Sequence, residues 1–232
     1  MKGYRFLLAD ADNTLFDFSA GERLALRQTF RAFSLPEDDA ALAAYLRINE
    51  ALWKALERGE TDSERLRVQR FELLLGELGL SRDANALSTH YLDALGRHPI
   101  LLPGAREAMA RWAKRVPVAI VTNGIAHAQR ARVARSPIHA YARALIISEE
   151  VGAAKPDPRI VHAALSALEC DDRSRALLLG DSLRADIAAA ANASIASCWF
   201  NPAGAEAPDD IRPTHIVASL DEVDALLMQA VS

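Results

Sequence analysis

The chain has 232 residues, of which 50% are hydrophobic and 25% charged, so it can bury a sizeable core in one or two domains. Its formal net charge of -4, without a long basic run, excludes the electrostatic footprint of a nucleic-acid-binding protein. Its two cysteines cannot build a disulfide framework, and no apolar stretch approaches a membrane span. We therefore expect a cytoplasmic protein, a monomer or homodimer, with no nucleic-acid or membrane partner.

The first predicted element is a short apolar run that ends at two carboxylates. Phe6 to Ala9 is typical of a buried strand, and Asp10-Ala11-Asp12-Asn13-Thr14 follows it. Because residues i and i+2 of a strand point to the same side, we expect Asp10 and Asp12 to project together. Two adjacent carboxylates repel, so they need a cation, a shared proton, or a function that uses one charged and one protonated. On this stretch alone, an Asx-type turn with both side chains in water is the alternative.

The next segment, from about Ser19 to Leu95, has helical periodicity throughout. Its apolar residues recur at helical spacing in two clear stripes, namely Leu42, Tyr45, Leu46, Leu52, Trp53 and Leu56, and then Val68, Phe71, Leu74, Leu75 and Leu78. Each stripe predicts an amphipathic helix whose apolar face belongs to the core of a helical bundle.

From Pro103 onward, strands and helices alternate. The expected strands are 116–121, 144–147, 176–179, 195–200 and 215–217. The expected helices are 104–115, one ending near 135, one opened by residues 155–158, 183–193 and 220–230, with loops at 148–154 and 201–213. Continuous apolar strands that alternate with helices predict a parallel sheet covered on both faces. The expected fold class is therefore α/β, with a core of residues 1–16 and 97–232 interrupted by a helical insert of residues 17–96.

Polar residues follow the ends of several of these strands. They are Asp10 and Asp12, Thr122 and Asn123, Asp181 with Asp186 nearby, and Lys155 after a strand and its loop. In open α/β sheets ligands bind at the carboxyl ends of the strands, so we expect these side chains to converge on one edge.

The chemistry of such an edge suits a phosphorylated ligand. Carboxylates at strand ends suit Mg²⁺, and Mg²⁺ with a lysine can neutralise a phosphate dianion. The hydroxyl of Thr122 can bond phosphoryl oxygens, while one carboxylate can act as a nucleophile through an aspartyl-phosphate. The second carboxylate of the pair can serve as a general acid and then as a general base.

Four segments in this order resemble the motifs of the haloacid dehalogenase (HAD) superfamily, over nearly the whole chain. They are Asp10-Ala11-Asp12-Asn13-Thr14, Thr122-Asn123-Gly124, Lys155-Pro156-Asp157, and Gly180-Asp181-Ser182 with Asp186. The resemblance implies a Rossmann-like parallel sheet core with an all-helical cap inserted after the first strand, which is where this chain has its helical block.

The resemblance also implies roles for single residues. Asp10 would be the nucleophile and Asp12 the general acid and base. Thr122 and Lys155 would bind the phosphoryl group, and Lys155 would also steady the nucleophile. Asn123, next to Thr122, is a candidate for substrate binding, with a turn-forming role as the alternative.

The metal site implied by the resemblance is a magnesium site. Asp10, the backbone carbonyl of Asp12, and Asp181 would hold Mg²⁺, with Asp186 as a supporting acid. The presence of Asp12 favours the hydrolysis of phosphate esters, because dehalogenases of this superfamily lack the second aspartate.

The expected function is hydrolysis of small phosphomonoesters, because the chain looks like the branch that contains pyrimidine 5′-nucleotidases. The first motif with its continuation Leu15-Phe16-Asp17-Phe18, and Cys198-Trp199-Phe200-Asn201-Pro202, carry this likeness. The alternatives are a sugar-phosphate or phosphoglycolate phosphatase, a phosphomutase, or a non-catalytic protein that binds a phosphorylated ligand. Asp17 and the residues of the cap are further candidates for substrate recognition.

Overall fold

The structure is a computed structural model that describes residues 3–227. Its chain divides into two compact units, Ser19–His98 and the remainder. The remainder contains a six-stranded parallel sheet in the order β3-β2-β1-β4-β5-β6. The strands are β1 Phe6–Ala9, β2 Val118–Thr122, β3 Ala144–Ile147, β4 Ala176–Gly180, β5 Ala196–Phe200 and β6 His215–Val217. The predicted α/β fold with a parallel sheet is therefore confirmed.

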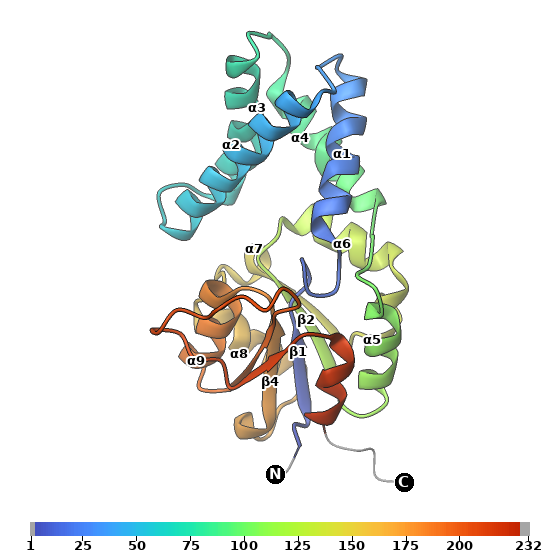
Figure 1. The fold of residues 1–232 in the computed structure, drawn as a ribbon, viewed down its shortest axis with the longest axis vertical. Coiled ribbons are helices and arrows are strands. Elements are labelled where there is room, and N and C mark those ends of the chain that lie inside the picture. Colours follow the sequence, from blue (N-terminus) through green and yellow to red (C-terminus); the bar gives the residue numbers. More distant parts are fainter. Residues whose placement is uncertain (1–2, 228–232) are drawn as a thin grey trace. The chain divides into compact units, whose positions relative to one another are not determined.

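Both faces of the sheet are covered, which explains why its central strands are apolar without alternation. Leu7 and Leu177 face one core with Met109 and Trp112 of α5 (Ala105–Ala113). Leu8 and Leu178 face the other, which holds Ile160 and Leu165 of α8 (Pro158–Ala167) and Ala189 and Ala190 of α9 (Ala188–Asn192). Figure 1 shows these helices on opposite sides of the strands. All four residues of β1 are buried, so this strand lies at the centre of the unit.

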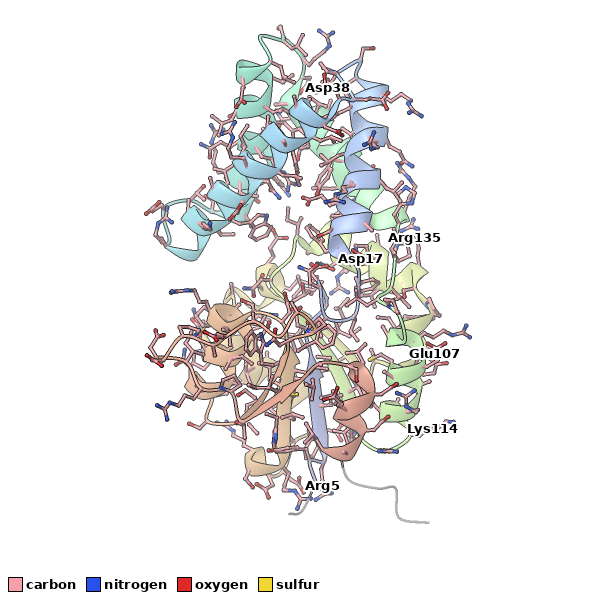
Figure 2. All side chains as sticks on the ribbon, viewed as in Figure 1. Arg5, Asp17, Asp38, Glu107, Lys114 and Arg135 are labelled. Carbon is pink, nitrogen blue, oxygen red and sulfur yellow. The ribbon has the colours of Figure 1, made fainter. Side chains whose placement is uncertain are left out.

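Charged side chains of the covering helices lie on the outside. Glu107 and Lys114, at the two ends of α5, are exposed and project from the sheet unit in Figure 2. Helix α6 (Ala126–Arg135) differs, because its buried residues include Gln129 and Arg132. Short 3₁₀ segments complete this unit at η1 (Pro137–Tyr141) and η2 (Arg173–Arg175).

The other unit is helical. It consists of α1 (Phe18–Ala32), α2 (Asp39–Glu57), α3 (Ser63–Glu77) and α4 (Ala84–Arg97). Helix α1 begins one residue before the unit, which starts at Ser19. Asp38, Asp62 and Asp83 cap α2, α3 and α4, each accepting a hydrogen bond from a backbone N–H of the first turn. The rings of Tyr45 and Phe71 pack 5.3 Å apart between centroids at the core of this unit. Among the described residues no helix is both long and apolar enough to cross a membrane.

The structure differs from the predicted elements in four places. Residues 148–154, expected as a loop, begin with one turn of helix, α7 (Ser148–Val151), which ends because Gly152 adopts a left-handed conformation with φ of 68°. The strand expected at 116–121 starts at Val118, because the N–H of Val116 still bonds to the carbonyl of Trp112 and closes α5.

The other two differences concern helices. The helix expected at 183–193 opens as a π-helical turn, η3 (Leu183–Ile187), because the N–H of Ile187 reaches back to the carbonyl of Ser182. The helix expected at 220–230 is the 3₁₀ segment η4 (Leu220–Ala225), with the N–H of Leu226 bonded to the carbonyl of Val223. The last part of that expected helix lies outside the described residues.

Candidate active site

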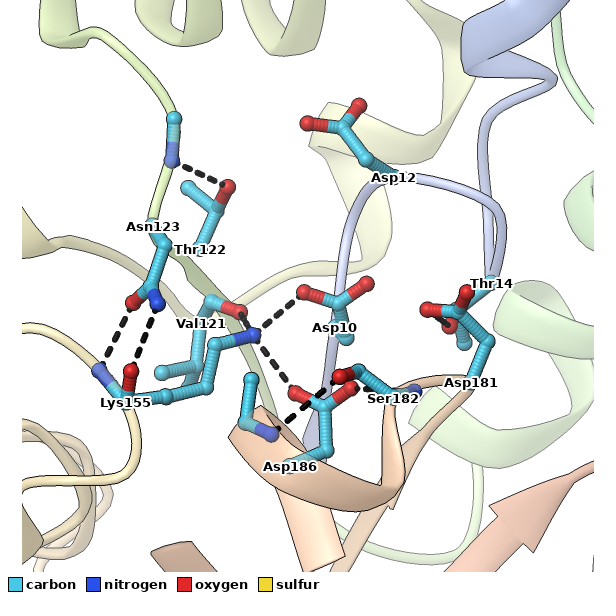
Figure 3. Close-up of polar contacts among 12 residues, drawn as sticks. Asp10, Asp12, Thr14, Val121, Thr122, Asn123, Lys155, Asp181, Ser182 and Asp186 are labelled. Carbon is cyan, nitrogen blue, oxygen red and sulfur yellow. Dashed lines mark hydrogen bonds and ion pairs between the residues drawn. The ribbon is translucent and has the colours of Figure 1, made fainter. Parts of the chain in front are cut away.

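Three adjacent strands end at the polar residues that the sequence singles out. Asp10 follows β1, Thr122 ends β2 and Asp181 follows β4, and β1 lies between β2 and β4 in the sheet. The chain leaves β1 toward β2 and β3 and later returns to β4 on the other side, so β1 marks the switch point where a crevice opens. Figure 3 shows Asp10, Thr122, Lys155, Asp181 and Asp186 gathered at this edge.

Lys155 is the cation of the site. It lies in the turn before α8, and its side chain is only 2% exposed. Its ammonium donates to Oδ1 of Asp10, to Oδ1 of Asp186 at 2.7 Å and to the carbonyl of Val121 at 3.0 Å. An ammonium has three protons, so all of them are used, and the lysine is fixed between two strands and η3.

Asn123 holds the backbone of Lys155 in place. Its Nδ2 donates to the carbonyl of Lys155 at 2.8 Å, and its Oδ1 accepts from the N–H of Lys155 at 2.8 Å. Both polar ends of the amide are therefore engaged by the residue that carries the cation. A direct contact between Asn123 and a substrate stays a prediction, and the observed contacts give it a positioning role.

Burial and the charge of the partner have opposite effects on the pKa of Asp10 and on that of Lys155. Burial raises the pKa of Asp10 well above its ordinary value; Lys155 lowers it, whereas Asp186 and Asp181 raise it further. Burial also works against the charged form of Lys155, but the carboxylates of Asp10 and Asp186 outweigh burial and leave the pKa of Lys155 raised. The lysine is therefore a permanent cation, and Asp10 depends on nearby positive charge to be ionised.

Asp181 and Asp186 share the loop after β4. Asp186 is 1% exposed, and its Oδ2 accepts from the N–H of Ser182 at 3.0 Å, so the π-helical turn is folded around its carboxylate. The carbonyl of Asp181 accepts from the indole Nε1 of Trp199 at 2.9 Å. Burial, followed by the charge of Asp186, raises the pKa of Asp181 to about 6. Trp199 thus fixes the backbone of Asp181, whose carboxylate is buried although its charged form is more stable in water.

The acidic residues of this edge fit a hard metal ion. Asp10, Asp181 and Asp186 offer carboxylate oxygens that all lie within 4.8 Å of one another. Three carboxylates share the ammonium of Lys155, so negative charge is in excess; burial, and after it this neighbouring negative charge, raise the pKa of Asp10 and of Asp181. Oxygen donors and excess negative charge suit Mg²⁺. Because Lys155 and Ser182 occupy the oxygens of Asp186, Asp10 and Asp181 are the better placed ligands.

Thr122 faces the same space from β2. It is 1% exposed, and its hydroxyl oxygen accepts from the N–H of Gly124 at 3.1 Å, so its O–H proton remains available to an acceptor. This geometry suits an oxygen of an anionic ligand placed between Thr122 and Lys155.

Asp12 does not project together with Asp10. Strand β1 ends at Ala9, so strand alternation does not reach these two residues, and the Asp12 carboxylate points away from Asp10 (Figure 3). Its partners come from α6, where Arg132 donates to Oδ1 at 2.5 Å and Gln129 donates to Oδ2 at 2.6 Å. Its side chain is absent from the acidic cluster, and the predicted role of its backbone carbonyl as a ligand stays a prediction.

Gln129 and Arg132 are site residues that were not predicted from the sequence. A signal was present, because on a helix these two residues fall on the same face as Ala128 and Val133, which are buried with them. A charged residue on a buried helix face needs a partner of opposite charge. The periodicity of α6 alone could not say that this partner is Asp12.

Comparisons with known proteins identify a matching family and several similar proteins. The model of the haloacid dehalogenase-like hydrolase family matches residues 4–194. The chain is 33% identical to the HAD-hydrolase YfnB of Bacillus subtilis, over 98% of this chain and 97% of that protein. The YfnB structure with bound magnesium superposes with a TM-score of 0.89 at 32% identity and covers 96% of this chain and 97% of that one.

Two further relatives carry the name of an activity. The pyrimidine 5′-nucleotidase YjjG of Escherichia coli is 33% identical, over 96% of this chain and 97% of that protein. The pyrimidine 5′-nucleotidase PynA of Streptococcus pneumoniae is 32% identical, over 95% of this chain and 93% of that protein.

Proposed function

This chain belongs to the haloacid dehalogenase-like hydrolases, and we propose that it is a magnesium-dependent phosphatase of small phosphomonoesters, with nucleoside 5′-monophosphates of pyrimidines as preferred substrates. One observation carries the proposal. Lys155, buried and bonded to Asp10 and Asp186, places a fixed positive charge beside a carboxylate and the hydroxyl of Thr122. A nucleophile, a cation and an anion-binding donor are what phosphoryl transfer requires.

The proposed reaction has two steps. Lys155 holds Oδ1 of Asp10, so Oδ2 attacks phosphorus while the bond to the leaving alkoxide breaks. Asp12 gives its proton to the leaving oxygen and then takes one from the water that hydrolyses the aspartyl-phosphate. The net change is a phosphomonoester and water converted to an alcohol and phosphate.

The remaining groups hold the substrate and its charge. The O–H of Thr122 donates to a phosphoryl oxygen, and the ammonium of Lys155, whose protons are held by Asp10, Asp186 and the carbonyl of Val121, contributes its positive charge. Mg²⁺ held by Asp10 and Asp181, with the backbone carbonyl of Asp12, would supply charge neutralisation for the transferring group. Asp186 keeps Lys155 oriented at 2.7 Å. Asn123 fixes the backbone of Lys155 from the neighbouring strand end.

The choice of substrate rests on the relatives. Two relatives of nearly full coverage are named pyrimidine 5′-nucleotidases. Asp12 supports an ester substrate, because an alkoxide leaving group needs a proton and a halide does not. We further propose that the helical unit, Ser19–His98, acts as a cap that excludes water and reads the leaving group.

The test is phosphate release from a panel of phosphomonoesters. It contains UMP, dUMP, dTMP, AMP, hexose phosphates, phosphoglycolate and p-nitrophenyl phosphate, each assayed with Mg²⁺ and with a chelator. We expect turnover that requires Mg²⁺, prefers the pyrimidine monophosphates and falls to background in Asp10→Asn. Asp157→Asn is the matched control, since this partly exposed carboxylate caps α8 outside the acidic cluster.

Each other outcome has a defined meaning. Turnover confined to a sugar phosphate or to phosphoglycolate would support the proposed phosphatase mechanism and refute the proposed pyrimidine nucleotide substrate. Turnover that persists in Asp10→Asn would refute the nucleophile. Absence of turnover, with Mg²⁺ and phosphate binding retained, would favour a protein that binds a phosphorylated ligand without hydrolysing it.

A further inference from the structure

The carboxylate of Asp12 is held by helix α6 and not by the groups that would surround a phosphate. Arg132 donates to its Oδ1 at 2.5 Å and Gln129 to its Oδ2 at 2.6 Å, so each oxygen has its own donor. The guanidinium of Arg132 also donates to Oε1 of Gln129 at 3.3 Å, which links the two donors to each other. Asp12 itself is partly open, with 25% of its side chain exposed.

Both donors are buried. Arg132 is 1% and Gln129 3% exposed, and the guanidinium of Arg132 lies 4.4 Å above the centroid of the Phe16 ring. Gln129 fills the space over Gly124, where a Cβ atom would lie 2.1 Å from its Nε2. The same turn bonds its Gly124 N–H to the hydroxyl of Thr122. The turn that presents Thr122 therefore also makes room for the side chain that holds Asp12.

The placement of Arg132 is hard to explain by stability. Burying a guanidinium is unfavourable, and replacing a buried ion pair by apolar residues is often neutral or stabilising. Among the described residues the Nε of Arg132 has no hydrogen-bond partner, so its burial is not fully compensated. By contrast, a side chain that must donate a proton to one oxygen gains from a fixed direction.

We propose that Gln129 and Arg132 are positioning residues for Asp12, an inference that rests on the function proposed above. They fix the direction of its carboxylate relative to the leaving oxygen of the substrate. Without them the short, partly exposed side chain of Asp12 rotates, and the proton transfer to the leaving group loses its geometry. Neither residue touches the substrate, so both act through Asp12.

The test compares two leaving groups in the intact enzyme. The values of kcat/KM report the steps through the first irreversible one, in which the alcohol leaves. A nucleoside 5′-alkoxide needs a proton in that step, whereas p-nitrophenolate departs without one. For Arg132→Met we expect kcat/KM to fall about 10- to 100-fold with UMP and less than about 3-fold with p-nitrophenyl phosphate. Gln129→Met removes the Nε2 donor to Asp12 and the Oε1 acceptor of Arg132 but leaves the Arg132–Asp12 ion pair, so it is expected to show a smaller loss with the same contrast.

Arg130→Met is the matched control, because Arg130 lies on the same helix, is exposed and pairs with Glu150. This variant should leave kcat/KM unchanged with both substrates. Equal losses with both substrates, or no loss with either, would overturn the inference while leaving the phosphatase in place. If Arg132→Met fails to fold, Gln129→Met alone decides by the same contrast. Wild-type enzyme without turnover of any phosphomonoester would refute the proposed function, and this inference with it.

Discussion

Replacing Lys155 by methionine tests the electrostatics of the site apart from catalysis. The change removes the ammonium that neutralises Asp10 and Asp186, which are 6% and 1% exposed. Breaking a buried ion pair from one side destabilises a protein by about 3–5 kcal/mol, because the remaining charges are left buried without compensation. Since whole domains are stable by only about 5–15 kcal/mol, the loss is a large part of the total.

The assay is urea denaturation followed by circular dichroism, at pH 7.5 with a chelator so that no divalent cation replaces the lost charge. Lys114→Met is the control, because Lys114 is exposed at the end of α5. Its effect should stay within about 0.5 kcal/mol. Lys155 lowers the pKa of Asp10 in the wild-type protein, so its removal raises that pKa further. Protonation then relieves the buried charge, and the deficit should be smaller at pH 5 than at pH 7.5.

A loss equal to that of Lys114→Met would refute this account of the buried cluster. A deficit that grows toward acid pH would also contradict it, since protonation of the carboxylates can only lessen their repulsion.

Further predictions concern the metal side of the site. Because burial holds the folded-state pKa of Asp181 at about 6, above its ordinary 3.8, the stability that its protonated form contributes is lost as pH rises. Between pH 4 and pH 7.5, we expect this group to lower the free energy of unfolding of the metal-free protein by about 2–3 kcal/mol. The measurement is the urea unfolding midpoint as a function of pH, and its decline with pH should be smaller in Asp181→Asn. The same decline in that variant as in the wild type would contradict this prediction. In Gly180→Ala the new Cβ would lie 2.2 Å from Cγ of Asp186, so we expect a loss of about 1–3 kcal/mol in thermal denaturation, and a wild-type melting temperature would argue against this crowding. Trp199→Phe removes the donor to the Asp181 carbonyl, so Mg²⁺ affinity in calorimetry should weaken by about 1 kcal/mol; unchanged affinity would exclude this support.

The strands and the site edge were predictable because their causes are local. A strand buried on both faces is apolar at every position, as Phe6–Ala9 is, and this pattern needs no knowledge of its neighbours. The residue that follows such a strand lies at the edge, which located Asp10, Thr122 and Asp181. The sequence did not reveal that their strands are adjacent, since strand order depends on how the crossovers pack.

Other features depend on contacts between distant segments. The π-helical turn at Leu183–Ile187 forms around Asp186, whose carboxylate caps the N–H of Ser182, and an alanine-rich segment gives no sign of it. The direction of Asp12 is set by a loop in which Asn13 adopts a left-handed conformation with φ of 59°. Strand alternation does not apply to a residue inside such a loop.

The two carboxylates of the first motif show how the structure resolves a conflict that the sequence posed. Asp10 and Asp12 would repel if they faced each other, and a cation, a shared proton, or a function that uses one charged and one protonated carboxylate would relieve this repulsion. Instead the chain turns after Ala9, and each carboxylate meets its own buried cation: Lys155 for Asp10 and Arg132 for Asp12. The cations come from separate elements, so the two carboxylates can differ in environment although they are two residues apart. That separation suits the roles proposed for them, Asp10 as nucleophile and Asp12 as general acid and base, because the two roles need different surroundings.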